Sequence, residues 1–198
     1  GLTFKLTYHN GSETIKQEFR YDNGIVDYIN ELCPEDEKRI SYTSFCEGES
    51  TGRDREDMKD YKVKMSAAFA FSNDVQLIEY YHNSSYLEHG GAPEKAVRSA
   101  FVSQIDSYLK NNNKYQKNET RISFQDIEEC LVIVISSFST QTSYENQTKK
   151  AITNKFIQEA MTDFFRHQLE VYFIENHGEA EKIAEQVLIN KRSRERSE

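Results

Sequence analysis

The sequence predicts a domain in which strands and helices share one core, and two observations lead to this prediction. Residues 131–136 (LVIVIS) form a short apolar run rich in Val and Ile, which is typical of a strand covered on both faces of a sheet. After a polar loop, apolar residues recur at a spacing of four: Ile152, Phe156, Ala160 and Phe164. This spacing places them on one wide face of a helix, which must lie on a core.

Composition and charge narrow the class of protein. The 198 residues suit one domain with a core of its own, and no run approaches the roughly 20 apolar residues of a membrane-spanning helix. The formal net charge of −8 argues against stable nucleic-acid binding, so we expect any contact with DNA to be local or transient. Because the chain starts at Gly1 in a strand-like pattern without Met, we expect it to be part of a longer protein.

The cysteines and histidines do not predict a metal centre. Cys33, Cys46 and Cys130 are odd in number and far apart, so we interpret them as free thiols in a reducing cytoplasm. The five histidines lack the spacing of metal ligands, and His82 falls in what reads as a loose loop. No nucleophile and base form a set, and two adjacent glycines at 90–91 are too few for a phosphate-binding loop. Residue types alone therefore give no complete catalytic site.

The first half of the chain reads as strands, turns and one short helix. Alternating apolar residues around the turn residues 9–12 (HNGS) predict a hairpin, and an amphipathic helix over 25–32 ends before Pro34. A possible strand over 40–46 is followed by a charged segment, 48–59, that predicts a mobile loop. Strict alternation over residues 63–71 and again over 75–81 then predicts a hairpin of two long antiparallel strands.

The second half is mainly helical around the apolar strand. A helix is expected over 93–110 with Pro93 in its first turn, and Arg98 lies off its apolar stripe. Ser123, followed by Asp126, predicts the cap of a single helical turn that leads into the strand. A last, more polar helix begins after Gly178, and its weak apolar face favours a connector over a core element.

One loop carries a recognisable pattern. Residues 144–152 (YENQTKKAI), between the apolar strand and the long helix, resemble the switch loop in the transducer domain of bacterial type IIA topoisomerase B subunits. The likeness covers nearly the whole chain: residues 1–6 look like the last strand of the family's ATPase domain, and 21–32 and 96–100 resemble its two helix segments.

The double-glycine loop resembles the family in part and differs from it in part. Glu88 with Gly90-Gly91 resembles the family's loop, yet Ala92-Pro93 stands where the family usually has Thr-His. Only Gly24 of a second glycine pair, before the first helix, is present. These departures leave the implied fold unchanged.

The resemblance implies an α+β fold like the second domain of ribosomal protein S-five. This fold has a four-stranded mixed sheet, a left-handed βαβ crossover, helices packed on one face and a C-terminal connector helix. Left-handed crossovers form only about 2% of such units, so residue patterns alone would have given the other hand. The implied organisation is a terminal hairpin (1–22) continuing from an absent upstream ATPase domain, the transducer domain (23–176) and the connector helix (177–198).

The resemblance also implies functional residues. Gln147, Thr148 and Lys149 would contact ATP held in the upstream domain, with Lys149 sensing the γ-phosphate and stabilising the transition state. Arg98 would face the DNA cavity. From composition alone, Lys149 reads as an ordinary solvated surface lysine. No metal site is expected here, because the Mg²⁺ and most of the ATP site lie upstream in the family.

The implied activity is that of the whole enzyme, an ATP-hydrolysing DNA topoisomerase (an isomerase) such as DNA gyrase or topoisomerase IV. Its partners would be DNA bound transiently, the topoisomerase A subunit and a second copy of the B subunit, in the cytoplasm and with no membrane. We expect the fragment alone to be inactive. The alternatives are a non-enzymatic RNA- or ribosome-binding module of the same fold, and the equivalent domain of a mismatch-repair or chaperone ATPase.

Overall fold

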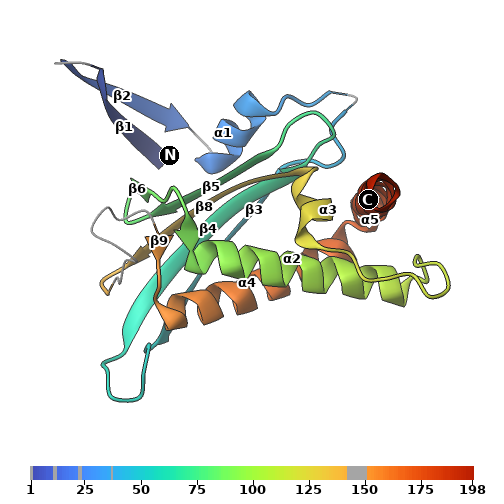
Figure 1. Cartoon of the computed structure of the whole chain (residues 1–198). Helices are drawn as coiled ribbons and strands as arrows, with labels where there is room; N and C mark the ends of the chain where they lie inside the picture. Colours follow the sequence, from blue (N-terminus) through green and yellow to red (C-terminus); the bar gives the residue numbers. More distant parts are fainter. Residues whose placement is uncertain (1, 11–12, 22–23, 37, 142–150) are drawn as a thin grey trace.

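The N-terminal residues form a two-stranded sheet of their own (Figure 1). The computed structural model describes residues 2–10, 13–21, 24–36, 38–141 and 151–198, and residues 2–21 by their backbone. Strand β1 (Leu2–Asn10) pairs antiparallel with β2 (Glu13–Tyr21), with Leu2 opposite Tyr21 and Asn10 opposite Glu13. This pairing confirms the hairpin that the alternation predicted.

The main sheet is mixed and is built around one central strand. Its order is β3 (Ser44–Gly52), β4 (Tyr61–Phe71), β8 (Leu131–Ser139), β5 (Leu77–His82) and β6 (Ser85–Tyr86). Strand β8 runs antiparallel to β4 and parallel to β5. Because β6 has only two residues, the sheet consists of the four long strands that the family resemblance implies, with a short addition at one edge.

The predicted hairpin over 63–81 is wrong, because β8 lies between its two strands. At the turn, the backbone N–H of Ser72 donates to the carbonyl of Cys130, the residue before β8, at 2.9 Å. The chain therefore reverses around the start of β8 and leaves a gap one strand wide. Alternation fixes which face each side chain meets but not which strand lies beside it.

Helices cover both faces of the sheet. The two long helices, α2 (Ala92–Asn111) and α4 (Lys155–Glu175), lie on one face, and α1 (Ile25–Leu32) lies on the other (Figure 1). The larger core buries alternate residues of β8 with aromatic side chains of the long helices: Leu131, Ile133, Ile135, Phe101 and Phe165. The smaller core lies under α1: Ile25, Ile29, Ala68, Ala70, Val132 and Val134. The prediction of helices on one face thus holds for the two long helices, while α1 adds cover to the opposite face.

The other elements join the ends of these layers. The short helix α3 (Phe124–Glu128) begins with the predicted cap, in which the N–H of Ser123 donates to Asp126 at 2.9 Å. Two-residue strands β7 (Gly90–Gly91) and β9 (Ala151–Ile152) pair in parallel. Ile152, which the spacing of four assigned to the long helix, therefore belongs to β9, because α4 starts three residues later at Lys155.

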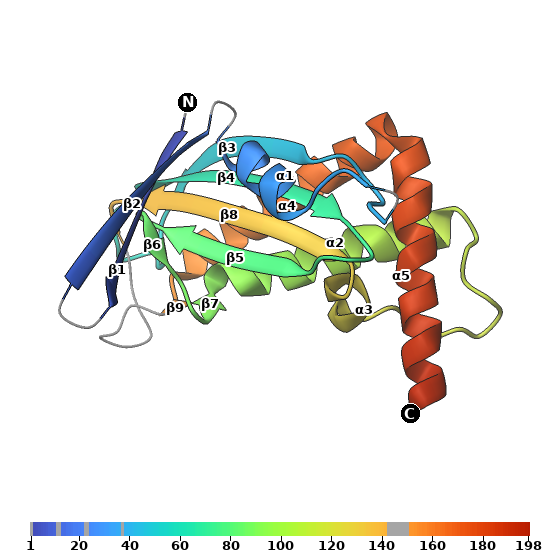
Figure 2. The same cartoon turned by 90° about the horizontal axis from the view of Figure 1, so that it is seen from above.

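The last helix, α5 (His177–Ser197), crosses one end of the molecule beside α3 (Figure 2). Five of its apolar residues are buried in the larger core, Ala180, Ile183, Ala184, Val187 and Leu188, whereas Ile189 is exposed. Beyond them, Lys191 is fully buried, with its Nζ 3.1 Å from Glu119 and 3.0 Å from Glu195. The hydrogen bonds that Arg192 donates to Glu119 lower the pKa of that carboxyl to about 2. The weak apolar face that the sequence predicts for this last helix is therefore buried along its first half, and the second half forms ion pairs.

The segment over 48–59, predicted as a mobile loop, contains the second half of β3. Gly48 lies opposite Met65 and Gly52 opposite Tyr61, whereas the strand expected over 40–46 coincides with β3 only from Ser44 onward. Beyond the strand, Asp54 accepts hydrogen bonds from the Phe156 N–H at 3.0 Å and from the Tyr61 hydroxyl at 2.6 Å. Its second oxygen accepts from Asn154 at 2.9 Å. A carboxylate a hundred residues away in sequence therefore caps the start of α4.

We predict that Asp54→Ala lowers the free energy of unfolding by about 1–3 kcal/mol, because it removes the acceptor for the Phe156 N–H in the first turn of α4 and for the buried side chains of Tyr61 and Asn154. Urea unfolding measures the change. Asp57→Ala is the control: Asp57 is exposed and its ion-pair partner among the described residues is exposed Arg55, so its loss should change stability by less than about 0.5 kcal/mol. Equal effects of the two variants would contradict the capping role.

Candidate functional site

The residues that the sequence analysis singled out for nucleotide contact, Gln147, Thr148 and Lys149, lie outside the described residues. The structure does describe both ends of the segment that carries them. The upstream end is the last part of β8, and the downstream end is β9. The site is therefore built from these two ends and from the residues that hold them.

The upstream end is held by two residues at the end of β5. The ring of His82 is fully buried, with Nδ1 2.7 Å from the Ser137 hydroxyl and Nε2 3.3 Å from the Ser139 hydroxyl. The Asn83 side chain accepts from the Ser139 N–H at 2.9 Å and donates to its carbonyl at 3.0 Å. An amide side chain thus continues the strand pairing of β5 with β8 by one residue.

His82 is therefore not on a loose loop, as its sequence neighbourhood suggested, but is the last residue of β5. Because the ring is buried among neutral hydroxyl groups, desolvation lowers its pKa to about 4. The ring is neutral at pH 7. Its role at this position is to hold β8 to β5, and the signal that could have predicted it is the alternation of β5, which runs on to residue 82.

The downstream end is held by the double glycine. Gly90 and Gly91 have φ values of 68° and 80°, a conformation that L side chains rarely adopt. A Cβ on Gly91 would lie 2.2 Å from the carbonyl oxygen of Ile152, so the two backbones approach more closely than any side chain allows. A Cβ on Gly90 would meet the Glu94 Cβ at 2.8 Å. The glycines thus serve strand pairing, a role that the sequence analysis did not predict.

Arg98 borders a hollow next to the double glycine. Its side chain is about half exposed, its Nε lies 3.2 Å from Glu94, and its guanidinium carbon lies 5.0 Å from the centre of the Phe124 ring. The hollow is lined by one aliphatic side chain and by polar and aromatic ones: Ile78, Tyr80, Glu88, His89, Glu94, Arg98, Phe124 and Glu128. Burial raises the pKa of the Tyr80 hydroxyl well above its ordinary value. The lining of the hollow thus contains three carboxylates and one guanidinium, of which Glu94 and Arg98 form an ion pair.

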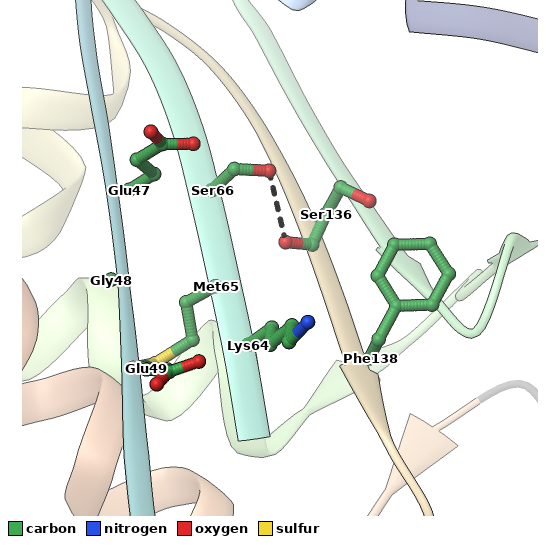
Figure 3. A pocket seen from close by; sticks show the side chains of 8 residues that line it. All are labelled: Glu47, Gly48, Glu49, Lys64, Met65, Ser66, Ser136 and Phe138. Atoms are coloured by element: carbon green, nitrogen blue, oxygen red, sulfur yellow. Dashed lines mark hydrogen bonds between the residues drawn. The ribbon is translucent and has the colours of Figure 1, made fainter. Parts of the chain in front are cut away.

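A second hollow lies on the face of the sheet that carries α1 (Figure 3). Charged side chains from neighbouring strands border it, with Lys64 on β4 and Glu47 and Glu49 on β3. Ser66 donates to the Ser136 carbonyl at 3.4 Å, which leaves its hydroxyl engaged with backbone. No nucleophile with an adjacent base lines this hollow, so it offers no catalytic arrangement.

Neither a metal-binding cluster nor a membrane-spanning helix occurs in the described part of the chain. It contains no group of three or more His, Cys, Asp or Glu side chains arranged to hold a metal ion. Cys33, Cys46 and Cys130 are free and buried, as predicted for unpaired thiols, and burial raises the pKa of Cys46 and Cys130 to about 12. No helix in these ranges is long and apolar enough to cross a membrane.

Comparison with known proteins gives one consistent family. The family model described as DNA gyrase B matches residues 24–198. The B subunit of DNA gyrase from Metamycoplasma arthritidis is 29% identical over 179 residues, which are 90% of this chain and 28% of that protein. The same subunit from Mycoplasmoides gallisepticum is 27% identical over 205 residues, covering 100% of this chain and 31% of that protein. The chain thus spans less than a third of these relatives.

Solved structures share the fold. The 43K ATPase domain of Thermus thermophilus gyrase B, in complex with an aminocoumarin, superposes with a TM-score of 0.75 at 18% identity, covering 98% of this chain and 50% of that one. The topoisomerase IV ATP-binding domain of Francisella tularensis gives 0.70 at 20% identity, with 98% and 49% covered. This likeness supports the α+β fold that the resemblance implied.

We predict that acid destabilises the chain through His82. The folded pKa of about 4 lies below the ordinary histidine value, so the unfolded chain binds more protons between about pH 6.5 and 4 and stability falls as the pH decreases through that window. One such group gives a slope of at most about 1.4 kcal/mol per pH unit. Urea unfolding of wild type and His82→Gln at several pH values measures the slope. Identical pH dependence in both proteins would contradict the prediction.

Proposed function

This chain belongs to the DNA gyrase B family, and we propose that it is the transducer domain of an ATP-dependent type II DNA topoisomerase B subunit. In this role it senses ATP in an upstream ATPase domain through Gln147, Thr148 and Lys149, and it couples hydrolysis to DNA strand passage. One observation carries the proposal: β9, which starts two residues after Lys149, is tied by its backbone to the double glycine of β7.

This arrangement provides a rigid backbone position close in sequence to the long, charged side chain of Lys149. Ala151, the first residue of β9, is two residues from Lys149 in the sequence, and its position is set by its pairing with Gly90 of β7. A lysine that starts from a rigid point loses less freedom when its ammonium group meets a phosphate. Such charge-assisted hydrogen bonds are the stronger class.

Nucleotide contact by this chain is limited, in our proposal, to residues 147–149. The ammonium of Lys149 would donate to the γ-phosphate, with Gln147 and Thr148 beside it, while Mg²⁺ and most of the ATP site belong to the upstream domain. In support, the gyrase B ATPase domain from Thermus thermophilus is about twice the length of the part that this chain matches. Half of that protein is therefore available for the rest of a nucleotide site.

A single lysine is not sufficient to drive the conformational change. A charge-assisted hydrogen bond contributes roughly 1.5–3 kcal/mol net. Changing a two-state population from 1:99 to 99:1 takes about 5.5 kcal/mol. We therefore infer that the ATP-driven change in the angle between the two domains also needs dimerisation of the B subunits through their upstream domains.

We propose the remaining partners by analogy with the family. Arg98 would meet the DNA segment transiently, α5 would carry the movement towards the A subunit, and the assembled enzyme would act in the cytoplasm. The net charge of −8 is opposed to tight DNA binding by this domain alone. The family match favours this function over an RNA- or ribosome-binding module and over a mismatch-repair or chaperone ATPase.

We predict that Lys149→Ala in the full-length protein lowers ATP turnover by more than about tenfold, because a cation aimed at the transferred phosphoryl group stabilises the transition state. Steady-state ATPase assays measure the loss. Lys150→Ala is the matched control, since it removes the same charge from the next residue and should leave turnover nearly unchanged. Normal turnover of both variants would make Lys149 an ordinary surface lysine.

We also predict that Arg98→Ala reduces DNA-stimulated ATP turnover more than basal turnover, by roughly threefold to tenfold, because it removes one phosphate contact without affecting the chemistry. The ratio of the two rates, measured with and without DNA, tests this. Lys95→Ala removes an exposed cation from the same helix, away from the hollow, and should leave the ratio unchanged. An equal loss of both rates in Arg98→Ala would indicate a folding defect instead.

A further inference from the structure

One ten-residue segment, 82–91, holds both ends of the segment that carries Lys149. At its start, Asn83 binds the backbone of Ser139 at the end of β8, and at its finish Gly91 pairs with Ile152 of β9. These two contacts flank residues 142–150 on either side. In Figure 2, β7 and β9 lie side by side below the sheet edge that β5 and β6 form.

The segment 82–91 is itself fixed to the sheet. The N–H of Asn83 donates to the Ser137 carbonyl at 2.8 Å, and the N–H of Leu87 donates to the Tyr80 carbonyl at 2.8 Å. The Leu87 side chain is 1% exposed and belongs to the larger core. Near its finish, the N–H of Gly91 donates to the His89 carbonyl at 2.8 Å. A displacement of this segment would therefore move both ends together.

We propose that segment 82–91 positions Lys149 for ATP hydrolysis, with Asn83 and Gly91 as its two positioning residues. This inference rests on the proposed function, because it assumes that Lys149 contacts the nucleotide. It adds that the accuracy of this contact is set by residues that do not touch the nucleotide themselves. A displacement of about 1 Å at a reacting group can lower a rate by up to roughly 100-fold.

Gly91→Ala is the variant that changes the geometry most directly. Its Cβ would collide with the Ile152 carbonyl oxygen, a backbone atom that cannot rotate away, and φ of 80° is unfavourable for Ala. The pairing of β7 with β9 must then shift. Because the change could also disturb folding, a second variant is needed at the other end of the segment.

Asn83→Gly is this second variant, and it introduces no backbone strain. Asn83 has φ of 49°, which glycine adopts readily, so the substitution removes both hydrogen bonds to Ser139 and leaves the backbone conformation favourable. Gly178→Ala is the matched control for a glycine substitution, since a Cβ there meets no atom within 4 Å. It should leave ATP turnover unchanged.

The experiment is a double-mutant cycle in the full-length protein. Gly91→Ala and Asn83→Gly are each made in wild type and in Lys149→Ala, and kcat and KM for ATP are measured with thermal unfolding as the check on folding. In wild type we expect each variant to lower kcat by roughly threefold to tenfold or more, with KM changed less. In Lys149→Ala we expect little further loss, because a positioning residue has nothing left to position.

Each outcome decides between distinct conclusions. If Lys149→Ala has normal turnover, the proposed function is wrong and the inference falls with it. If Lys149→Ala is impaired while both segment variants keep normal kcat, the inference alone is wrong. It is also wrong if the segment variants lower kcat by the same factor in both backgrounds, because they would then act independently of Lys149.

Discussion

The burial of β8 on both faces is the constraint on which the rest of the structure depends. Its alternate residues enter two cores, Leu131, Ile133 and Ile135 under the long helices and Val132 and Val134 under α1. A strand buried on both faces over residues 131–137 needs a neighbour at each edge and a layer on each side, which explains why β4 and β5 flank it. The truncation of one such side chain to Ala typically costs about 2–5 kcal/mol. The core therefore fixes residues 131–137 of β8, whereas Phe138 near the end of the strand is exposed.

Elements with a clear pattern of apolar residues or a local capping signal could be predicted from the sequence. The apolar run of β8, the face of α4 and the capping pair Ser123 and Asp126 each express a local rule, and the structure follows them. The fold as a whole needed the family resemblance, because residue patterns do not specify strand order or crossover hand. The candidate nucleotide contacts at 147–149 came from the resemblance alone and stay a proposal.

The features that could not be predicted all depend on contacts between distant residues. The two strands predicted over 63–81 exist, but they do not pair with each other. Strand β8, about 60 residues later in the sequence, lies between them. Asp54 reads as one of many loop carboxylates until α4 lies beside it. The double glycine looks too short for phosphate binding and proves to be a place where two backbones meet. In each case the sequence shows the residue type but not the distant residue that it contacts in the fold.

The ionic end of α5 has a consequence for how movement passes through the molecule. Arg194 binds the carboxylate of Asp126, which also caps α3, and α3 leads directly into β8. Asn190 donates to the carbonyl of the same residue at 2.9 Å. A helix of this length extends about 30 Å, and its contacts with the rest of the chain run from buried Ala180 to Arg194. Because these contacts extend over most of its length, α5 cannot tilt on its own, and a shift of α3 at the start of the central strand would move the whole helix with it.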